Sequence, residues 1–197
     1  MSWSWRFAAW VAGGWPVREI ALHIMDLVEN SIRAQATVIA VTLEADSAND
    51  RLRIIIEDNG TGLKVPPAQV LDPFYTTKGG KRTGLGLSLF KAAAEAAGGT
   101  LTIDKGRLAD TGVRVTVEMK LSHVDRTPLG DLAGTLAAVV CTHPEIDFRF
   151  DLRLGERTWD VRVAELAREL GHGSPLKLAR QVQSRVAAAL QESQVSM

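Results

Sequence analysis

Three side chains that suit cations, water and phosphate lie close together near the start of the chain. Asp26 and Asn30 are four residues apart, and Arg33 follows three residues later. On a helix, Asp26 and Asn30 share one face, and Arg33 joins its edge. A carboxylate, an amide oxygen and a guanidinium that converge there could hold Mg²⁺, orient a water and contact a phosphate. A solvated polar helix face is the competing interpretation, which this segment alone does not exclude.

A second group combines a carboxylate with two glycines. Asp58, Gly60 and Gly62 come just after the apolar run 54–56, with Glu57 between that run and Asp58. A carboxylate at the end of a strand can accept a hydrogen bond from the exocyclic amine of adenine, and glycines let the backbone approach a flat base closely. The sequence Asp-Asn-Gly at 58–60 is also common in tight turns, which is the competing interpretation.

A third group stands where the next predicted helix begins. It consists of Thr83, Gly84, Leu85, Gly86 and Leu87. Glycines at such a place expose backbone N–H groups that can cradle a phosphate. Each group is weak evidence by itself, but their order along the chain favours one nucleotide pocket.

The elements that must position these groups alternate between helical and strand patterns. Apolar residues recur at steps of three and four over 17–32, which predicts an amphipathic helix. Alternation predicts strands at 38–44, 52–56, 101–104 and 113–121, and composition predicts a helix over 85–97 that ends at a glycine pair. The intervening segment 64–83 is too polar and too broken for a core element. This order predicts an α+β fold in which helices cover a mostly antiparallel sheet.

In these motifs the sequence resembles the GHKL ATPases, which include sensor histidine kinases, gyrase, MutL and heat-shock chaperone ATPases. Residues 26–34 resemble the asparagine box of that family, and 58–62 and 84–87 resemble its two glycine boxes. Residues 72–78 resemble the phenylalanine box of histidine kinases. The resemblance covers roughly half of the chain and implies the two-layer α/β sandwich known as the Bergerat ATP-binding fold.

The resemblance also implies roles for single residues. Asn30 would coordinate Mg²⁺, and Asp58 would recognise the adenine of ATP. Lys78, Gly84 and Gly86 would contact the phosphates, and the segment 64–83 would be a mobile lid. Arg33 matches the basic residue usual in histidine kinases.

Three positions depart from the family pattern. Asp26 is shorter than the glutamate that activates water in the hydrolysing branches, and Gly112-Val113 replaces a Gly-Thr pair, so that one hydroxyl beside the adenine is missing. Arg82 stands where many kinases have another glycine, which should stiffen the lid.

Phosphotransfer would also need an acceptor histidine. His123 begins a segment, His-Val-Asp-Arg-Thr-Pro-Leu, that resembles an acceptor box with its acidic residue one position late. We instead expect Asp125 or Thr127 to cap a new helix there, with Pro128 at its first position. His23 is interpreted as a packing residue of the first helix.

The remainder of the chain divides into a leader and a second unit. Residues 1–16 are interpreted as a disordered leader, 17–122 as the ATPase domain and 123–197 as a small α/β module for a protein partner or for dimerisation. In that module we expect helices at 129–140, 164–170 and 175–191 and strands at 146–154 and 158–163. Asp147, Asp151 and Asp160 are expected to face solvent.

Composition narrows the function classes. Lys and Arg together number 23, as do Asp and Glu, so the formal net charge is zero. Overall charge therefore does not favour binding to nucleic acid or to an anionic membrane. The single cysteine, Cys141, excludes an intrachain disulfide and suits the cytoplasm. As a whole the chain resembles stand-alone ATP-binding proteins found near hydrogenase genes, which implies a redox enzyme as partner. Two classes stay open: an enzyme that hydrolyses or transfers the γ-phosphate, and a switch or scaffold that only binds Mg-ATP.

Overall fold

The computed structural model describes residues 19–63, 65–71, 85–171 and 173–193. Within them a single six-stranded sheet has the order β3-β4-β2-β1-β5-β6. Neighbouring strands are antiparallel except β1 and β5, which run parallel. The strands are β1 (Val38–Asp46), β2 (Arg51–Asp58), β3 (Thr100–Lys105), β4 (Val113–Lys120), β5 (Asp147–Leu154) and β6 (Arg157–Arg162). The predicted, mostly antiparallel sheet is confirmed.

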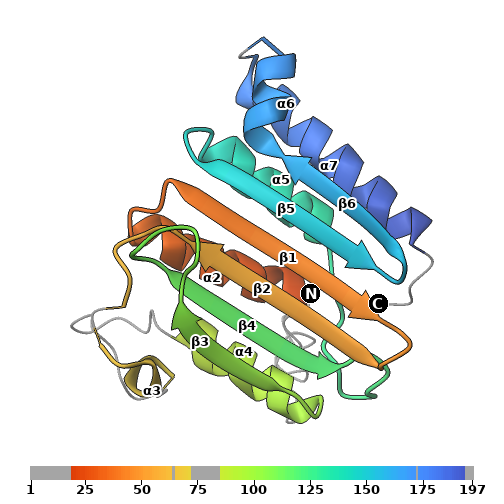
Figure 1. Cartoon of the computed structure of the whole chain (residues 1–197). Helices are drawn as coiled ribbons and strands as arrows, with labels where there is room; N and C mark the ends of the chain where they lie inside the picture. Colours follow the sequence, from red (N-terminus) through yellow and green to blue (C-terminus); the bar gives the residue numbers. More distant parts are fainter. Residues whose placement is uncertain (1–18, 64, 72–84, 172, 194–197) are drawn as a thin grey trace, which may run out of the picture.

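Helices form a second layer behind the sheet, as Figure 1 shows. Helix α2 packs between α4 and α5, and α5 packs against α7. The helices are α2 (Ile20–Arg33), the short α3 (Pro67–Val70), α4 (Leu85–Ala96), α5 (Leu132–Thr142), α6 (Val163–Glu169) and α7 (Pro175–Glu192). The described chain is therefore a two-layer α/β sandwich, as expected.

The core lies between the two layers because the strand residues alternate. On β1 and β5 every second residue is buried, and Phe148 and Phe150 are less than 2% exposed. Helix α2 turns Ile20, Ile24 and Leu27 toward this core. Burial of such side chains contributes about 1.5–3 kcal/mol each. One hydrophobic cluster runs from α2 through the sheet to α7.

Residues after 122 extend the same sheet. The connection that leads to them lies along the beginning of α2, where the amides of Ile20 and Ala21 donate to the carbonyls of Pro128 and Leu129 at 2.9 Å. These bonds satisfy helix N–H groups that have no partner within the helix. Strand β5 then pairs with β1 over residues 147–154.

The expectation that Asp125 or Thr127 begins a helix is wrong. Helix α5 begins at Leu132, and its cap is Asp131, whose carboxylate accepts from the amide of Gly134 at 2.8 Å. Pro128 is not the first helical residue, because α5 begins four residues later; its carbonyl accepts from the amide of Ile20. No helix among the described residues is long and apolar enough to cross a membrane.

Candidate functional site

The carboxylate of Asp58 is the centre of the site. It stands at the end of β2, on the side of the sheet that faces the helices, and it is 5% exposed. Its Oδ2 accepts from the hydroxyl of Ser31 at 2.6 Å. Its Oδ1 accepts from the amides of Gly60 at 2.9 Å and Val113 at 3.3 Å. Helix α2, the end of β2 and the start of β4 together therefore hold one carboxylate in a fixed orientation.

Glycines around Asp58 allow the chain segments to approach it. A Cβ at Gly60 would lie 2.7 Å from the carbonyl oxygen of Ala34, and one at Gly112 would lie 2.1 Å from that of Asp58. Gly112 also has a φ of 119°, which side chains rarely tolerate. Gly62 has a φ of 75° and lies next to Gly112. Gly60 and Gly112 are therefore needed for the close approach of the segments beside Asp58, and Gly62 is needed for its backbone conformation.

The side chain of Asn30 is engaged by its own helix. Its Oδ1 accepts from Arg33 at 2.6 Å, and Arg33 also donates to Glu29 at 2.6 Å. The three side chains are solvent-accessible on the C-terminal half of α2. A cation at Asn30 Oδ1 would lie beside the guanidinium of Arg33, whose positive charge would repel it.

The beginning of α4 lies against Asp26. A Cβ at Gly86 would be 3.1 Å from both the Cβ and Oδ2 of Asp26. One turn earlier on α2, His23 is 3% exposed and stacks on Phe90 of α4, with ring centroids 4.6 Å apart. His23 is thus a packing residue, as the sequence indicates. It fixes α4 beside α2, and the backbone of Gly86 therefore lies against the side chain of Asp26.

The other predicted phosphate contacts can be placed only in part. Lys78, Thr83 and Gly84 lie outside the described residues. Leu85 opens α4, and the half-buried Leu87 packs against the core. The backbone N–H groups in the first turn of a helix have no partner within the helix and can bind an anion. An apolar side chain at Leu85 or Leu87 does not prevent such a contact.

His123 lies far from Asp58. It follows the end of β4, whereas Val113, which binds Asp58, begins that strand. At about 3.3 Å per residue, the seven steps of β4 separate the two positions by about 23 Å. His123 instead lies beside Gly98, just after the end of α4, and its Nδ1 accepts from the amide of Asp125 at 3.1 Å.

Sequence reasoning missed two residues that organise the site. Ser31 supplies the hydroxyl that binds Asp58, and Asn59 accepts from the amides of Thr37 and Val38 at 2.9 Å each, which fixes the turn between α2 and β1. Asn59 lies within the first glycine group and could have been read as a turn residue. No local pattern pointed to Ser31, because its bond to Asp58 joins residues that are 27 positions apart in the chain.

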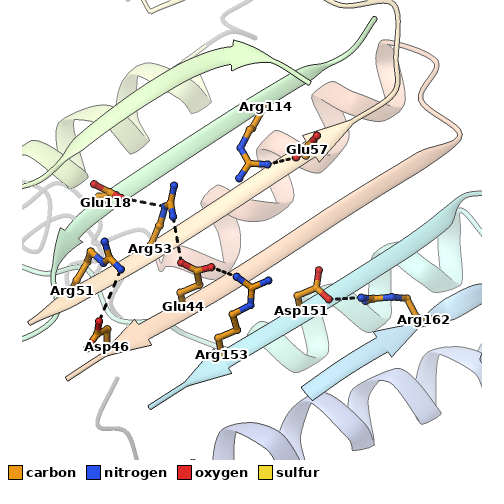
Figure 2. Close-up of polar contacts among 10 residues, drawn as sticks. All are labelled: Glu44, Asp46, Arg51, Arg53, Glu57, Arg114, Glu118, Asp151, Arg153 and Arg162. Carbon is orange, nitrogen blue, oxygen red and sulfur yellow. Dashed lines mark hydrogen bonds and ion pairs between the residues drawn. The ribbon is translucent and has the colours of Figure 1, made fainter. Parts of the chain in front are cut away.

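The opposite face of the sheet carries a network of ion pairs (Figure 2). Glu44 lies at its centre, 2.5 Å from Arg153 and 3.6 Å from Arg53, which in turn lies 3.1 Å from Glu118. Asp151 pairs with Arg162 at 2.6 Å, and Asp147 with Arg149 at 2.7 Å. The aspartates of β5 are thus ion-paired, and they line a hollow on this face together with Ala40 and Thr42. Asp58 faces away from this hollow.

A buried carboxylate surrounded by glycines, opposite a helix with Asp26 and Asn30, is the arrangement that the sequence motifs predict. The family model of the histidine kinase-, DNA gyrase B- and HSP90-like ATPases matches residues 17–123, and the chain belongs to this family.

The chain is similar to histidine kinases and to one ATPase domain of known structure. The chain is 26% identical over 157 residues to an uncharacterized sensor-like histidine kinase of Rhizobium meliloti, covering 77% of this chain and 30% of that one. It is 35% identical over 95 residues to the histidine-protein kinase/phosphatase UhpB of Salmonella typhimurium, covering 48% and 16%. The chain thus spans less than a third of these relatives. The MutL ATPase domain of Aquifex aeolicus, solved with ADP, is 16% identical, with a TM-score of 0.46 and coverage of 83% and 67%.

Proposed function

We propose that this chain binds Mg-ATP between α2, α4 and the end of β2, and that it acts as a regulatory protein of the histidine-kinase-like type. The observation that carries the proposal is the state of Asp58. Two amides occupy Oδ1 and one hydroxyl occupies Oδ2. Since each carboxylate oxygen has two lone pairs, Oδ2 retains one acceptor position, which suits the amine of adenine.

The phosphates would lie at the beginning of α4. Gly86 leaves room for backbone N–H groups there, and the positive end of the helix dipole favours anions. Lys78, Thr83 and Gly84 belong to the same proposed cradle, and residues 64–83 would close over it as the lid. Asn30 would hold Mg²⁺ once Arg33 releases it, and Arg33 would then be free to pair with a phosphate. Mg²⁺ would neutralise phosphate charge.

Two outcomes of binding differ in the role of Asp26. In the first, Asp26 orients a water and the protein slowly hydrolyses ATP, or it transfers the γ-phosphate. In the second, ATP is a conformational ligand that changes how residues 123–197 contact a partner, such as a redox enzyme or a second copy of the chain. The contact between Asp26 and Gly86 favours a role for Asp26 beside the phosphates. A cytoplasmic location belongs to the same proposal.

Titration of the full chain with ATP and Mg²⁺ in a calorimeter tests the proposal. We expect saturable binding, together with slower proteolysis within residues 64–83 at saturating ATP. The absence of both effects would refute it. Incubation with γ-labelled ATP then separates the two outcomes, because only the first releases or transfers the label.

A further inference from the structure

A second buried carboxylate, that of Glu57, lies next to Asp58 in the chain. Because successive strand residues point to opposite faces, the side chain of Glu57 lies on the face of the sheet opposite the helices (Figure 2). Glu57 is 6% exposed. Its Oε1 accepts from the amide of Arg107, and its Oε2 accepts from the guanidinium of Arg114. Glu57 therefore binds the hairpin of β3 and β4, at least 50 residues further along the chain.

The same hairpin reaches the other face of the sheet through its loop, residues 106–112. The amide of Gly106 donates to the carbonyl of Gly112 at 3.1 Å, which closes the base of the loop. Directly after the loop, the amide of Val113 donates to Oδ1 of Asp58 at 3.3 Å. A Cβ at Gly106 or Gly112 would lie 2.9 or 2.1 Å from the carbonyl oxygen of Asp58. Two consecutive carboxylates of β2 therefore hold this loop, one from each face of the sheet.

We propose that Glu57 is a positioning residue of the nucleotide pocket, because it fixes the loop 106–112 from the far face of the sheet. This inference rests on the proposed function. A Cβ at Gly62 would lie 3.6 Å from the amide nitrogen of Gly112, so the loop lies against the first glycine group. Movement of the loop would displace that wall of the pocket, although the side chain of Glu57 lies on the other face.

Glu44 provides the comparison, because it is ion-paired on the same face but does not hold the loop. Its side chain is 14% exposed and lies 2.5 Å from Arg153 and 3.6 Å from Arg53, both of which belong to strands. Loss of Glu44 should therefore lower stability without moving the loop. If Glu57 were only structural, its loss would have the same effect.

The test compares the full chain with Glu57→Leu, Glu57→Gln and Glu44→Leu. Amide hydrogen exchange followed by NMR measures the protection of the amide of Val113, which binds Asp58 rather than Glu57. We expect Glu57→Leu to speed exchange at Val113 about tenfold and to weaken the binding of Mg-ATP about tenfold. Glu57→Gln should lie between this variant and the parent, because its carbonyl oxygen can still accept from the amide of Arg107. Glu44→Leu should lower the melting temperature and leave both quantities unchanged.

Two results would overturn the inference. One is unchanged exchange at Val113 in Glu57→Leu, or in Glu57→Gln where the leucine variant does not fold. The other is a loss of ATP affinity no larger than that of Glu44→Leu, which would give Glu57 a structural role only. Failure of the parent protein to bind ATP would instead refute the proposed function, and exchange at Val113 would then decide separately whether Glu57 fixes the loop.

Discussion

At the scale of single residues, the acceptor-only chemistry of Asp58 leads to the first prediction. Asp58→Asn replaces one carboxylate oxygen by an NH₂ group, which faces either Ser31 or the amides of Gly60 and Val113. We expect ATP affinity to fall at least about tenfold, since hydrogen bonds to charged groups contribute roughly 1.5–3 kcal/mol. Calorimetry measures the change. Asp125→Asn, at an exposed carboxylate, is the matched control. Equal affinity in parent and Asp58→Asn would contradict the role of Asp58.

Asp26 gives a second prediction at the same scale. Asp26→Asn keeps the shape of the side chain beside Gly86 but removes a base. ATP turnover should fall at least about tenfold, because general bases contribute about 10²–10⁴-fold, while the dissociation constant of ATP changes little. A coupled phosphate-release assay measures this, with Glu95→Gln on α4 as control. A turnover rate that survives Asp26→Asn would exclude Asp26 as the base.

At the scale of elements, the packing of α4 on α2 determines how much space the phosphates have. Gly86→Ala places a methyl group 3.1 Å from Asp26 Oδ2, a tight contact that a small shift can relieve. Alanine also favours a helix over glycine by about 1 kcal/mol, so that stability should change little. ATP affinity should nevertheless fall, because the methyl group occupies the phosphate side of the helix.

Gly155 serves as the control, because its replacement should change stability and leave ATP affinity unchanged. Gly155, in the turn between β5 and β6, has a φ of 62°, and no atom lies within 4 Å of the position that a Cβ would occupy there. Gly155→Ala should lower the melting temperature through backbone strain while ATP affinity is unchanged. Thermal unfolding and calorimetry on both variants check the pair, and unchanged ATP affinity in Gly86→Ala would place the phosphates elsewhere.

The pairing of β5 with β6 yields a pH-dependent prediction. Asp151 and Asp160 are opposite each other, and the pKa of Asp160 is raised above 3.8 by its hydrogen bond with Asp151, with burial as the next cause. A carboxyl with a raised folded-state pKa stabilises the fold at low pH, and this contribution is lost as the pH rises through that pKa. Asp160→Asn should therefore raise the melting temperature at pH 7, with a gain that shrinks as the pH falls toward 3.8. Thermal unfolding of the parent and of Asp160→Asn at pH 7 and near pH 3.8 measures this difference. An equal rise in melting temperature at the two pH values would contradict the hydrogen bond between Asp151 and Asp160.

At the scale of the whole molecule, His123 and the proposed phosphate site lie at opposite ends of α4. The ten steps from Gly86 to Ala96 span about 15 Å at 1.5 Å per residue. We therefore expect His123→Ala to leave ATP binding and any turnover unchanged, and the parent protein to acquire no acid-labile phosphate from γ-labelled ATP. Acid-labile label that disappears in His123→Ala would require transfer between two copies of the chain.

Several features of this protein could be predicted from the sequence. The helix at α2 and the strands β1, β2 and β4 follow from local periodicity, because the alternation or three-to-four spacing of apolar residues reflects which side of an element is buried. Asp58 closes β2 two residues after the apolar run 54–56, and Gly60 follows two residues later, so that their place at the end of a strand was also visible.

Other features depended on contacts between distant segments. The parallel pairing of β1 with β5, more than a hundred residues away, is decided by the burial of their shared face, which no local pattern specifies. The bond from Ser31 to Asp58, the capture of Asn30 by Arg33 and the contact of Gly86 with Asp26 likewise require side chains to be placed in space. The sequence alone determined which chemical groups are available and which elements carry them. Only the tertiary structure decided which of those groups meet, because hydrogen bonds act over about 3 Å and depend on the packing of every element between them.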